Sequence, residues 1–348
     1  MIKSLFRNIF QILSTALMLA TALSYLSPWI DPSIFRWCSY FGTAFPWLLI
    51  FNILFLLFWI WRKNRFAAYH LGMLALGWAY IARFWGMGTP AAPPKDAVTI
   101  VTHNVGAMFV KKKINERMVD SMAMAYAKFL NENGAPDVLC TQETKGAFYP
   151  AVGKYLGYDQ RFNLKKGTVI MSRFPILAGG DIPFGKTSNS TLWADIQFPG
   201  NRIARVYNVH LQSNKVTQDA DKVIESPDKE DWDEVKKIVN KVGGATSTRS
   251  EQAQQLREHL LKCKYPVIIC GDFNDTPNSY VYRHISEGLT DAFEAAGSGR
   301  GTTFAGRIPL LRIDYIFTDP GFPVYQSRVV RDGRWSDHYP VWAVIGIQ

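Results

Sequence analysis

The sequence predicts an α/β or α+β domain of about 250 residues behind an apolar N-terminal region. Two observations predict this organisation. Long stretches without a charged residue occur only in about the first 85 residues, whereas short strand-like and helical runs alternate from Val98 onward. With 48% hydrophobic and 20% charged residues in a chain of 348, the composition excludes a disordered or fibrous protein.

The N-terminal region contains three segments without a charged residue. They cover residues 8–30, 37–61 and 66–82. A helix of about 20 residues crosses the hydrocarbon of a bilayer, so the first two segments are long enough, and Arg83 can extend toward the interface beyond the shorter third. Within a membrane region spanning residues 1–88, we predict three transmembrane helices at about 8–30, 41–61 and 66–85. A buried or re-entrant third helix and a signal peptide in place of the first remain alternatives.

Basic residues predict the orientation of these helices. Lys3 and Arg7 precede the first segment, and Arg62, Lys63 and Arg65 lie in the turn between the second and third. The positive-inside rule places the N-terminus and this turn in the cytoplasm. After three crossings the remaining chain emerges on the other side, which we predict to be the periplasmic face of a bacterial inner membrane.

A linker and a folded domain follow the membrane region. Gly86–Pro94 reads GMGTPAAPP, which cannot continue a helix, so we predict a linker over 86–97 and a domain over 98–348. Strand-like runs in this domain are β-branched or aromatic and are bounded by Gly, Pro, Asn or Asp. They cover residues 98–105, 137–143, 168–172, 191–198, 202–211, 266–273, 312–317 and 341–347. Residues 112–133 and 249–262 have helical spacing of apolar positions.

Polar side chains stand at the end of one predicted strand after another. They are Asn104, Glu143, His210, Asp272, Asn274, Asp314, Asp337 and His338. Strand ends at one edge of a sheet converge, and a buried charge is costly unless it is paired or bound to a metal. Carboxylate and amide oxygens without a thiolate cluster suit Mg²⁺ or Mn²⁺, and histidines supply positive charge near a phosphate. A single aspartate at a strand end is more often a turn former or helix cap, which is our interpretation of Asp275, Asp291 and Asp319.

Seven short strings in one order strengthen this interpretation. Between residues 103 and 341 the chain contains HNV, QETK, SRFPI, NVHLQS, GDFND, RIDYIF and SDHYPV. Together they resemble the endonuclease/exonuclease/phosphatase superfamily, which includes pancreatic-type deoxyribonuclease, apurinic endonucleases, inositol-polyphosphate phosphatases and bacterial sphingomyelinases. The resemblance covers essentially the whole domain and implies a four-layer α/β/β/α sandwich in which two mixed sheets pack face to face.

The resemblance implies a metal site. It makes Glu143 of QETK the principal ligand of Mg²⁺ or Mn²⁺, with Asn104 beside it. Asp337 then completes the metal and water environment.

The resemblance also implies catalytic roles. Asp272 orients or deprotonates the attacking water, and Asn274 hydrogen-bonds the phosphoryl oxygens. His338 contacts the phosphate as an imidazolium held by Asp314, and His210 is a candidate acid for the leaving oxygen. These roles agree with phosphoryl transfer, which needs mainly charge neutralisation and an in-line water, but the identity of the base stays open.

Three further residues are weaker phosphate-binding candidates. Lys145 follows Glu143 closely, but an exposed lysine is an equally good interpretation. Asn189 and Arg249 lie beside the strings, where turn formation or salt bridging explains them equally well. The charged segment 214–248 is either a solvated helix or a cap beside the site.

These observations predict a membrane-anchored, metal-dependent hydrolase of phosphodiesters, acting on a lipid or small phosphorylated substrate. Residues 1–95 hold eight Lys or Arg and one Asp or Glu, so most of the net charge of +10 belongs to the membrane region. The remaining domain is close to neutral, whereas strong nucleic-acid binders usually present a basic face. A membrane-tethered nuclease and an inactive binding module are the alternatives. Membrane lipids and the phosphoester substrate are the expected partners, and no protein partner can be inferred.

Overall fold

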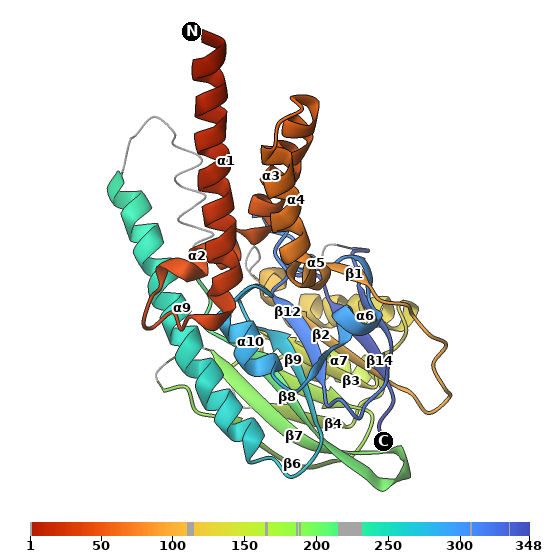
Figure 1. Ribbon diagram of the computed structural model, residues 1–348. Helices are drawn as coiled ribbons and strands as arrows, with labels where there is room; N and C mark the ends of the chain where they lie inside the picture. The colour runs from red at the N-terminus through yellow and green to blue at the C-terminus, as the bar shows by residue number, and fades with distance from the viewer. Residues whose placement is uncertain are drawn as a thin grey trace.

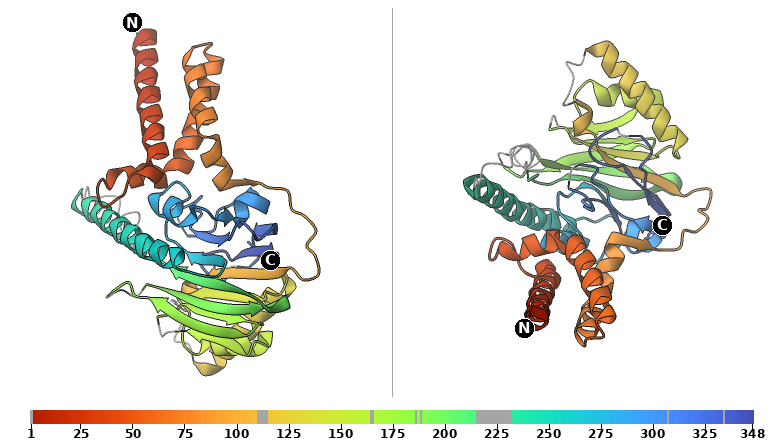
Figure 2. Two further views of the ribbon diagram at one scale, coloured as in Figure 1. Left: turned by 60° about the horizontal axis from the view of Figure 1, so that its bottom comes forward. Right: turned by 90° about the horizontal axis from the view of Figure 1, so that it is seen from above.

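The computed structural model describes residues 2–109, 115–163, 166–185, 187, 189–214, 232–306, 308–333 and 335–348. These residues form a group of N-terminal helices and a domain built on two sheets (Figure 1). The longest helices of the N-terminal group project from one end of the domain (Figure 2).

Two six-stranded sheets form the centre of the domain. The first has the order β13 (Val324–Val329), β14 (Val341–Ile345), β2 (Val98–Asn104), β3 (Val138–Gln142), β5 (Val169–Ser172) and β4 (Gln160–Asn163). The second has the order β10 (Thr290–Asp291), β12 (Asp314–Thr318), β9 (Val267–Asp272), β8 (Arg202–His210), β7 (Ser190–Phe198) and β6 (Ile176–Ile182). Both sheets are mixed, because β2 runs parallel to β3 and β8 parallel to β9 between antiparallel neighbours. Each of the eight predicted strand runs overlaps one of these strands, and the prediction of two mixed sheets is confirmed.

Alternate side chains on each strand fill different layers of the domain. On β2, Ile100 packs between the two sheets, whereas Val101 packs under α6 (Glu116–Glu132) and α7 (Phe148–Leu156). On β9, Ile268 joins the core between the sheets. Its neighbour Ile269 packs under α9 (Trp232–Leu261) and α10 (Tyr280–Ser286). The period of two along each strand therefore produces the four layers α/β/β/α.

Both predicted helices of the domain are present. The first begins at Glu116, after Asn115, whose Oδ1 caps the helix by accepting from Met118 N at 2.9 Å. The predicted start at residue 112 lies outside the described residues. The second, α9, is longer than the predicted 249–262 and includes the end of segment 214–248, of which residues 215–231 also lie outside the described part.

The apolar region forms one helix that is long enough to cross a membrane. This span, Leu5–Trp29, consists of most of α1 (Ile2–Leu26) and the short helix after it. A second span would have to combine α2 (Trp37–Thr43) and α3 (Phe45–Trp61), which meet at a bend of 64°. Of the three predicted spanning helices, the described residues therefore contain one that is long and apolar enough to cross a membrane, or two if the bent pair is a single span.

The predicted third span is wrong as a continuous helix because the chain breaks at Gly77. Helix α4 (Phe66–Leu76) has only 11 residues and α5 (Trp78–Phe84) has seven. A Cβ at Gly77 would lie 2.1 Å from Tyr25 Oη, and the same hydroxyl donates to the carbonyl of Met73 at 2.8 Å. Close contact with α1 therefore fixes a glycine, the weakest helix former after proline, in the middle of the segment. Even so, α1, α3 and α4 pack side by side (Figure 1).

The predicted linker 86–97 begins as paired structure. Residues 85–87 form β1 (Trp85–Met87), which pairs with β11 (Ser298–Arg300). Immediately before it, the carbonyl of Arg83 accepts a hydrogen bond from Arg312 at 2.7 Å. Arg312 is buried and binds both carboxylate oxygens of Asp291 at 2.6 and 2.7 Å. The helical region is therefore built into the domain instead of being tethered by a flexible connection.

Candidate active site

The predicted site residues converge where the two sheets end. In the second sheet, His210, Asp272 and Asp314 are register partners on the adjacent strands β8, β9 and β12. In the first sheet, Asn104 is the last residue of β2 and Glu143 follows β3. Hydrogen bonds from Asn104 Nδ2 to Glu143 Oε1 at 3.0 Å and to Asp272 Oδ2 at 2.9 Å connect the two sheets.

Asp272 is the centre of this cluster and is fully buried. Besides Asn104, it accepts from the backbone N–H of Asn274 at 2.9 Å and from Asn274 Nδ2 at 3.2 Å. Burial raises the pKa of Asp272 to about 7, since desolvation disfavours the carboxylate more than the nearby His338 favours it. Gly271 allows the strand to approach its neighbour here, because its φ is 142° and a Cβ would lie 1.9 Å from Val209 O.

His338 forms a buried ion pair with Asp314. Its Nδ1 lies 3.0 Å from Asp314 Oδ2, and its Nε2 lies 3.8 Å from Asp272 Oδ2. Burial by itself would lower the pKa of His338, but the two carboxylates outweigh it and raise the pKa to about 10. The predicted imidazolium at this position has the electrostatic partners that it needs.

His210 lies on the other side of Asp272 and has a different environment. Its Nε2 is 3.6 Å from Glu143 Oε1 and 4.0 Å from Asp272 Oδ2. Both ring nitrogens are buried without a hydrogen-bond partner among the described residues. Burial lowers the pKa of His210 despite the nearby Glu143. A neutral imidazole offers one N–H and one lone pair, and both remain available to a ligand.

The set of oxygen donors fits a hard divalent cation. Glu143 has a positive φ of 54° and a side chain that is 46% exposed, so its carboxylate faces the opening of the site. Its Oε1 and Asp272 Oδ2 both contact the amide of Asn104, which brings two carboxylates and an amide together. A second group, Asp272, Asp314 and His338, also has candidate ligand atoms within 4.8 Å of one another. Because a protonated imidazole cannot bind a metal, the residues that could hold a cation here are Glu143 and, through its Oδ1 and not the Nδ2 that contacts the carboxylates, Asn104.

Asn274 and Asp337 complete the predicted cluster. Asn274 has a φ of 52°, and its Nδ2 also donates to Leu211 O at 3.1 Å. Asp337 accepts from Ser336 Oγ at 3.1 Å and lines the same cavity as Glu143. Its carboxylate is therefore beside the proposed cation without belonging to the hydrogen-bonded centre.

The three weaker candidates lie outside the cavity. The ammonium of Lys145 lies 5.5 Å from the ring centre of Phe109. Asn189 is buried and donates to Leu211 O at 2.7 Å, which joins two strand ends. Arg249 is buried in an ion pair, with its Nε 3.1 Å from Asp275 Oδ2. Asn189 and Arg249 therefore hold the loops around the site, as the alternative interpretations of the sequence allowed.

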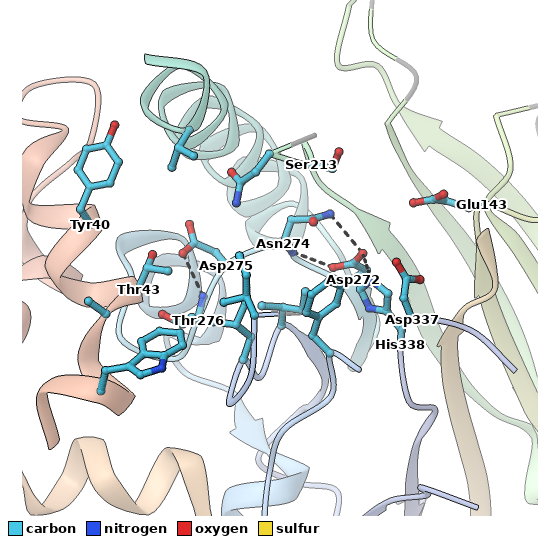
Figure 3. A pocket seen from close by; sticks show the side chains of 18 residues that line it. Tyr40, Thr43, Glu143, Ser213, Asp272, Asn274, Asp275, Thr276, Asp337 and His338 are labelled. Atoms are coloured by element: carbon cyan, nitrogen blue, oxygen red, sulfur yellow. Dashed lines mark hydrogen bonds and ion pairs between the residues drawn. The ribbon is translucent and has the colours of Figure 1, made fainter. Parts of the chain in front are cut away.

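A cavity of about 400 Å³ leads from the cluster to the N-terminal helices. In Figure 3, Glu143, Asp337 and His338 lie toward one end, whereas Tyr40 and Thr43 lie at the other. Sequence reasoning missed the residues from α2, α3 and their junction, and no local signal identifies them. They are Tyr40, Thr43, Ala44 and Trp47.

Solved structures of known proteins share the fold of the domain. An endonuclease/exonuclease/phosphatase family protein from Bacteroides thetaiotaomicron superposes with a TM-score of 0.54 at 18% identity, covering 73% of this chain and 98% of that one. A mannosyl-6-phosphatase from Bacteroides thetaiotaomicron gives a TM-score of 0.52 at 16% identity, with 72% and 99% covered. D. rerio TDP2 complexed with single strand DNA product gives 0.52 at 18% identity, with 72% and 100% covered. Comparison with curated protein sequences finds no match.

Family models account for both parts of the chain. Residues 7–84 match a model described as a domain of unknown function (DUF8431). Residues 117–338 match the model of the Endonuclease/Exonuclease/phosphatase family, over a range that includes Glu143, His210, Asp272, Asp314 and His338. With more than half of the chain matched and the buried cluster at the strand ends, this protein belongs to the Endonuclease/Exonuclease/phosphatase family and is a phosphoester hydrolase.

Proposed function

We propose that this protein is a membrane-anchored, divalent-cation-dependent phosphodiesterase that acts on a lipid or small phosphorylated substrate outside the cytoplasm. The observation that carries the reaction is the buried centre in which Asp272 lies between the imidazoles of His210 and His338. This arrangement combines a buried carboxyl group with the imidazolium of His338, whose Nε2 lies 3.8 Å from Asp272 Oδ2. Phosphoryl transfer requires both a positioned water and charge neutralisation.

The residues divide the chemistry among them. Asp272 orients the attacking water and accepts its proton as the new bond to phosphorus forms. The bond from phosphorus to the leaving oxygen breaks in the same step, and His210, whose ring nitrogens have no partner among the described residues, donates a hydrogen bond to that oxygen, which then takes a proton from solvent. The imidazolium of His338 and the amide of Asn274 stabilise the charge on the phosphoryl oxygens. Asp314 acts through His338. Its Oδ2 lies 3.0 Å from His338 Nδ1, and its negative charge favours the protonated ring.

A Mg²⁺ or Mn²⁺ ion would be held by Glu143 and Asn104, with Asp337 nearby, which leaves Asp272 to act on the water. When bound, the cation supplies further neutralisation of the phosphoryl charge. Glu143 supports this assignment because its side chain is 46% exposed and, among the described residues, it forms an ion pair with neither Lys nor Arg.

The distribution of basic residues supports the membrane anchor and its orientation. The start of α1 and the turn at residues 62–65 lie together at the end of the helices that is remote from the domain (Figure 1). Both carry positive charge, and α1 and α3 expose apolar side chains along their lengths. We therefore propose a cytoplasmic N-terminus and a periplasmic domain at a bacterial inner membrane. A reporter fused after Gln348 that is active only in the cytoplasm would refute this orientation.

The hydrolysis is tested with the full chain in detergent, using bis(p-nitrophenyl) phosphate with Mg²⁺ or Mn²⁺. We expect turnover by the wild type and a loss of roughly 10²–10⁴-fold in kcat for Asp272→Asn and His338→Ala, in the range of acid–base and electrostatic contributions. Asp159→Asn, which changes an exposed carboxylate outside the cavity, serves as the matched control. Unchanged hydrolysis in Asp272→Asn contradicts the site, and no hydrolysis by the wild type contradicts the phosphodiesterase. A parallel assay with DNA and RNA tests the nuclease alternative.

A further inference from the structure

We propose that the membrane region supplies part of the substrate site, a chain subsite that holds the apolar chain of a lipid phosphodiester. The chain subsite consists of Ala44 and Trp47 on one side of the cavity and Ile308, Leu311 and Ile313 on the other. The inference rests on the proposed function, because it concerns a substrate whose phosphate is cleaved at Asp272.

The position of the cavity is the first observation. One continuous cavity of about 400 Å³ is lined by Asp272 and His338 and also by Trp47, more than 200 residues earlier in the sequence. This volume is in the range of about 300–1,000 Å³ that is usual for small-molecule sites. The reacting group and an apolar chain can therefore occupy the same cavity at its two ends (Figure 3).

The chemistry of the walls is the second observation. Apolar lining comes from both parts of the chain, with Ala44 and Trp47 from the N-terminal helices and Ile308 and Leu311 from the domain. Charged side chains line the same cavity at the catalytic centre, where Glu143, Asp337 and His338 lie together (Figure 3). A lipid phosphodiester likewise combines one charged phosphate with hydrocarbon, so a cavity with both kinds of lining suits it.

The third observation is that the apolar wall continues into a helix with an exposed apolar surface. Trp47 lies near the start of α3, and Phe51, Leu54 and Leu57 follow on that helix with 51–57% of their surface exposed. Residues 45–61 contain no charged side chain. A chain that leaves the cavity along α3 would therefore remain in contact with hydrocarbon-like surface, so the lipid need not leave the membrane completely.

The α2–α3 corner is fixed against the loop that carries the catalytic amide. Thr276 Oγ1 donates to Gly42 O at 3.4 Å, and Asn278 Nδ2 donates to Ser24 O at 3.1 Å. A Cβ at Gly42 would lie 2.3 Å from Asn278 O, so the two backbones are in close contact. Because Asn274 begins this loop, the distance between the chain subsite and the catalytic centre is set by the fold.

The charge of the cavity disfavours a polynucleotide. Among the described lining residues, Glu143, Asp272, Asp275 and Asp337 are acidic and none is Lys or Arg. A nucleic-acid strand carries a phosphate at every nucleotide and is bound mainly through basic side chains. A lipid with one phosphodiester carries a single phosphate charge, which the groups of the catalytic centre can neutralise by themselves.

The test compares lipids with their chain-free counterparts in the full-length protein. Mixed micelles of phosphatidylcholine, phosphatidylethanolamine and phosphatidylglycerol are assayed beside the corresponding deacylated glycerophosphodiesters, with bis(p-nitrophenyl) phosphate as a soluble reference. We expect at least one lipid to exceed its deacylated counterpart in kcat/KM at least tenfold. Trp47→Ala should reduce this ratio at least tenfold, mainly through KM, and Trp61→Ala, at the exposed far end of α3, should leave it within twofold.

Ile308→Ser is a second variant, and it should fold normally because Ile308 is 43% exposed. This substitution should also reduce the ratio of kcat/KM on the lipid to kcat/KM on its deacylated counterpart. Equal loss on lipid and deacylated substrates in both variants overturns the chain subsite, as does a wild type that prefers the deacylated compounds or DNA. If the wild type cleaves bis(p-nitrophenyl) phosphate but no lipid, the chain subsite fails and the phosphodiesterase stands. If it cleaves none of these compounds, the proposed function itself fails.

Discussion

Replacing Asp314 with asparagine separates the charge of the His338 partner from its shape. In the wild type, the Asp314 carboxylate lies 3.0 Å from His338 Nδ1 and both side chains are buried. Asparagine keeps the volume and one oxygen but removes the negative charge. Asp272, at 3.8 Å from Nε2, then remains as the nearest carboxylate of His338.

The pKa of His338 gives the direction of the effect. Because its pKa is raised from 6.5 to about 10 in the folded protein, the fold binds the proton more tightly than the unfolded chain does. The resulting stabilisation is fully present below about pH 6.5 and is lost as the pH rises through about 10. Breaking a buried pair by removing one partner costs about 3–5 kcal/mol. At roughly 2–4 °C per kcal/mol for a domain of this size, Tm at pH 7 should fall by roughly 6–20 °C.

The assay is the pH dependence of kcat/KM together with Tm, measured for the wild type and Asp314→Asn. We expect the alkaline limb of activity, near pH 10 in the wild type, to move at least one unit toward neutral pH in the variant. Asp195→Asn is the matched control, because it breaks the pair of Asp195 with Arg205, 2.6 Å apart, without touching His338. The control should lower Tm and leave the alkaline limb in place. If Asp314→Asn lowers Tm but keeps the limb near pH 10, Asp314 is not the cause of the raised pKa.

Three further predictions concern the cation and the junction. Glu143→Gln should raise the Mg²⁺ or Mn²⁺ concentration for half-maximal activity by about 10–100-fold, the effect usual for the loss of a residue that supports a metal site. Removal of the cation with a chelator should abolish wild-type activity reversibly. If the variant needs the same cation concentration as the wild type, Glu143 does not belong to the metal site. Gly106→Ala places a Cβ 2.1 Å from Glu143 Oε2 and 2.9 Å from Glu143 Cβ, so the Glu143 carboxylate must move and the cation concentration for half-maximal activity should rise similarly. Asp291→Asn leaves the buried Arg312 without its carboxylate and should cost about 3–5 kcal/mol in unfolding free energy, measured by denaturant titration. A loss below about 1 kcal/mol, the range of exposed pairs, would contradict a buried ion pair at the junction.

The sequence predicted the chemistry of the site because that chemistry is encoded locally. Each of Asn104, His210 and Asp272 ends a strand whose apolar, β-branched pattern is visible in the chain. Strand ends at one edge of a sheet converge, and the seven ordered strings that resemble a known family selected these residues from the other polar residues at strand ends. Asp291 and Asp319 also behave as predicted, since both accept backbone N–H groups at a helix start or a turn.

Tertiary structure decided where these local features meet the rest of the chain. The break at Gly77 depends on contact with Tyr25, and the burial of Arg249 depends on Asp275; neither partner is indicated by the residues around it. The chain subsite joins Trp47 to Leu311, which are 264 positions apart. Period and residue type fix the conformation of a segment and the face that it buries, but contacts between distant segments depend on which packed surfaces fit together. The sequence by itself therefore indicated the residues of the reaction centre, and only the folded structure brought the N-terminal helices to it.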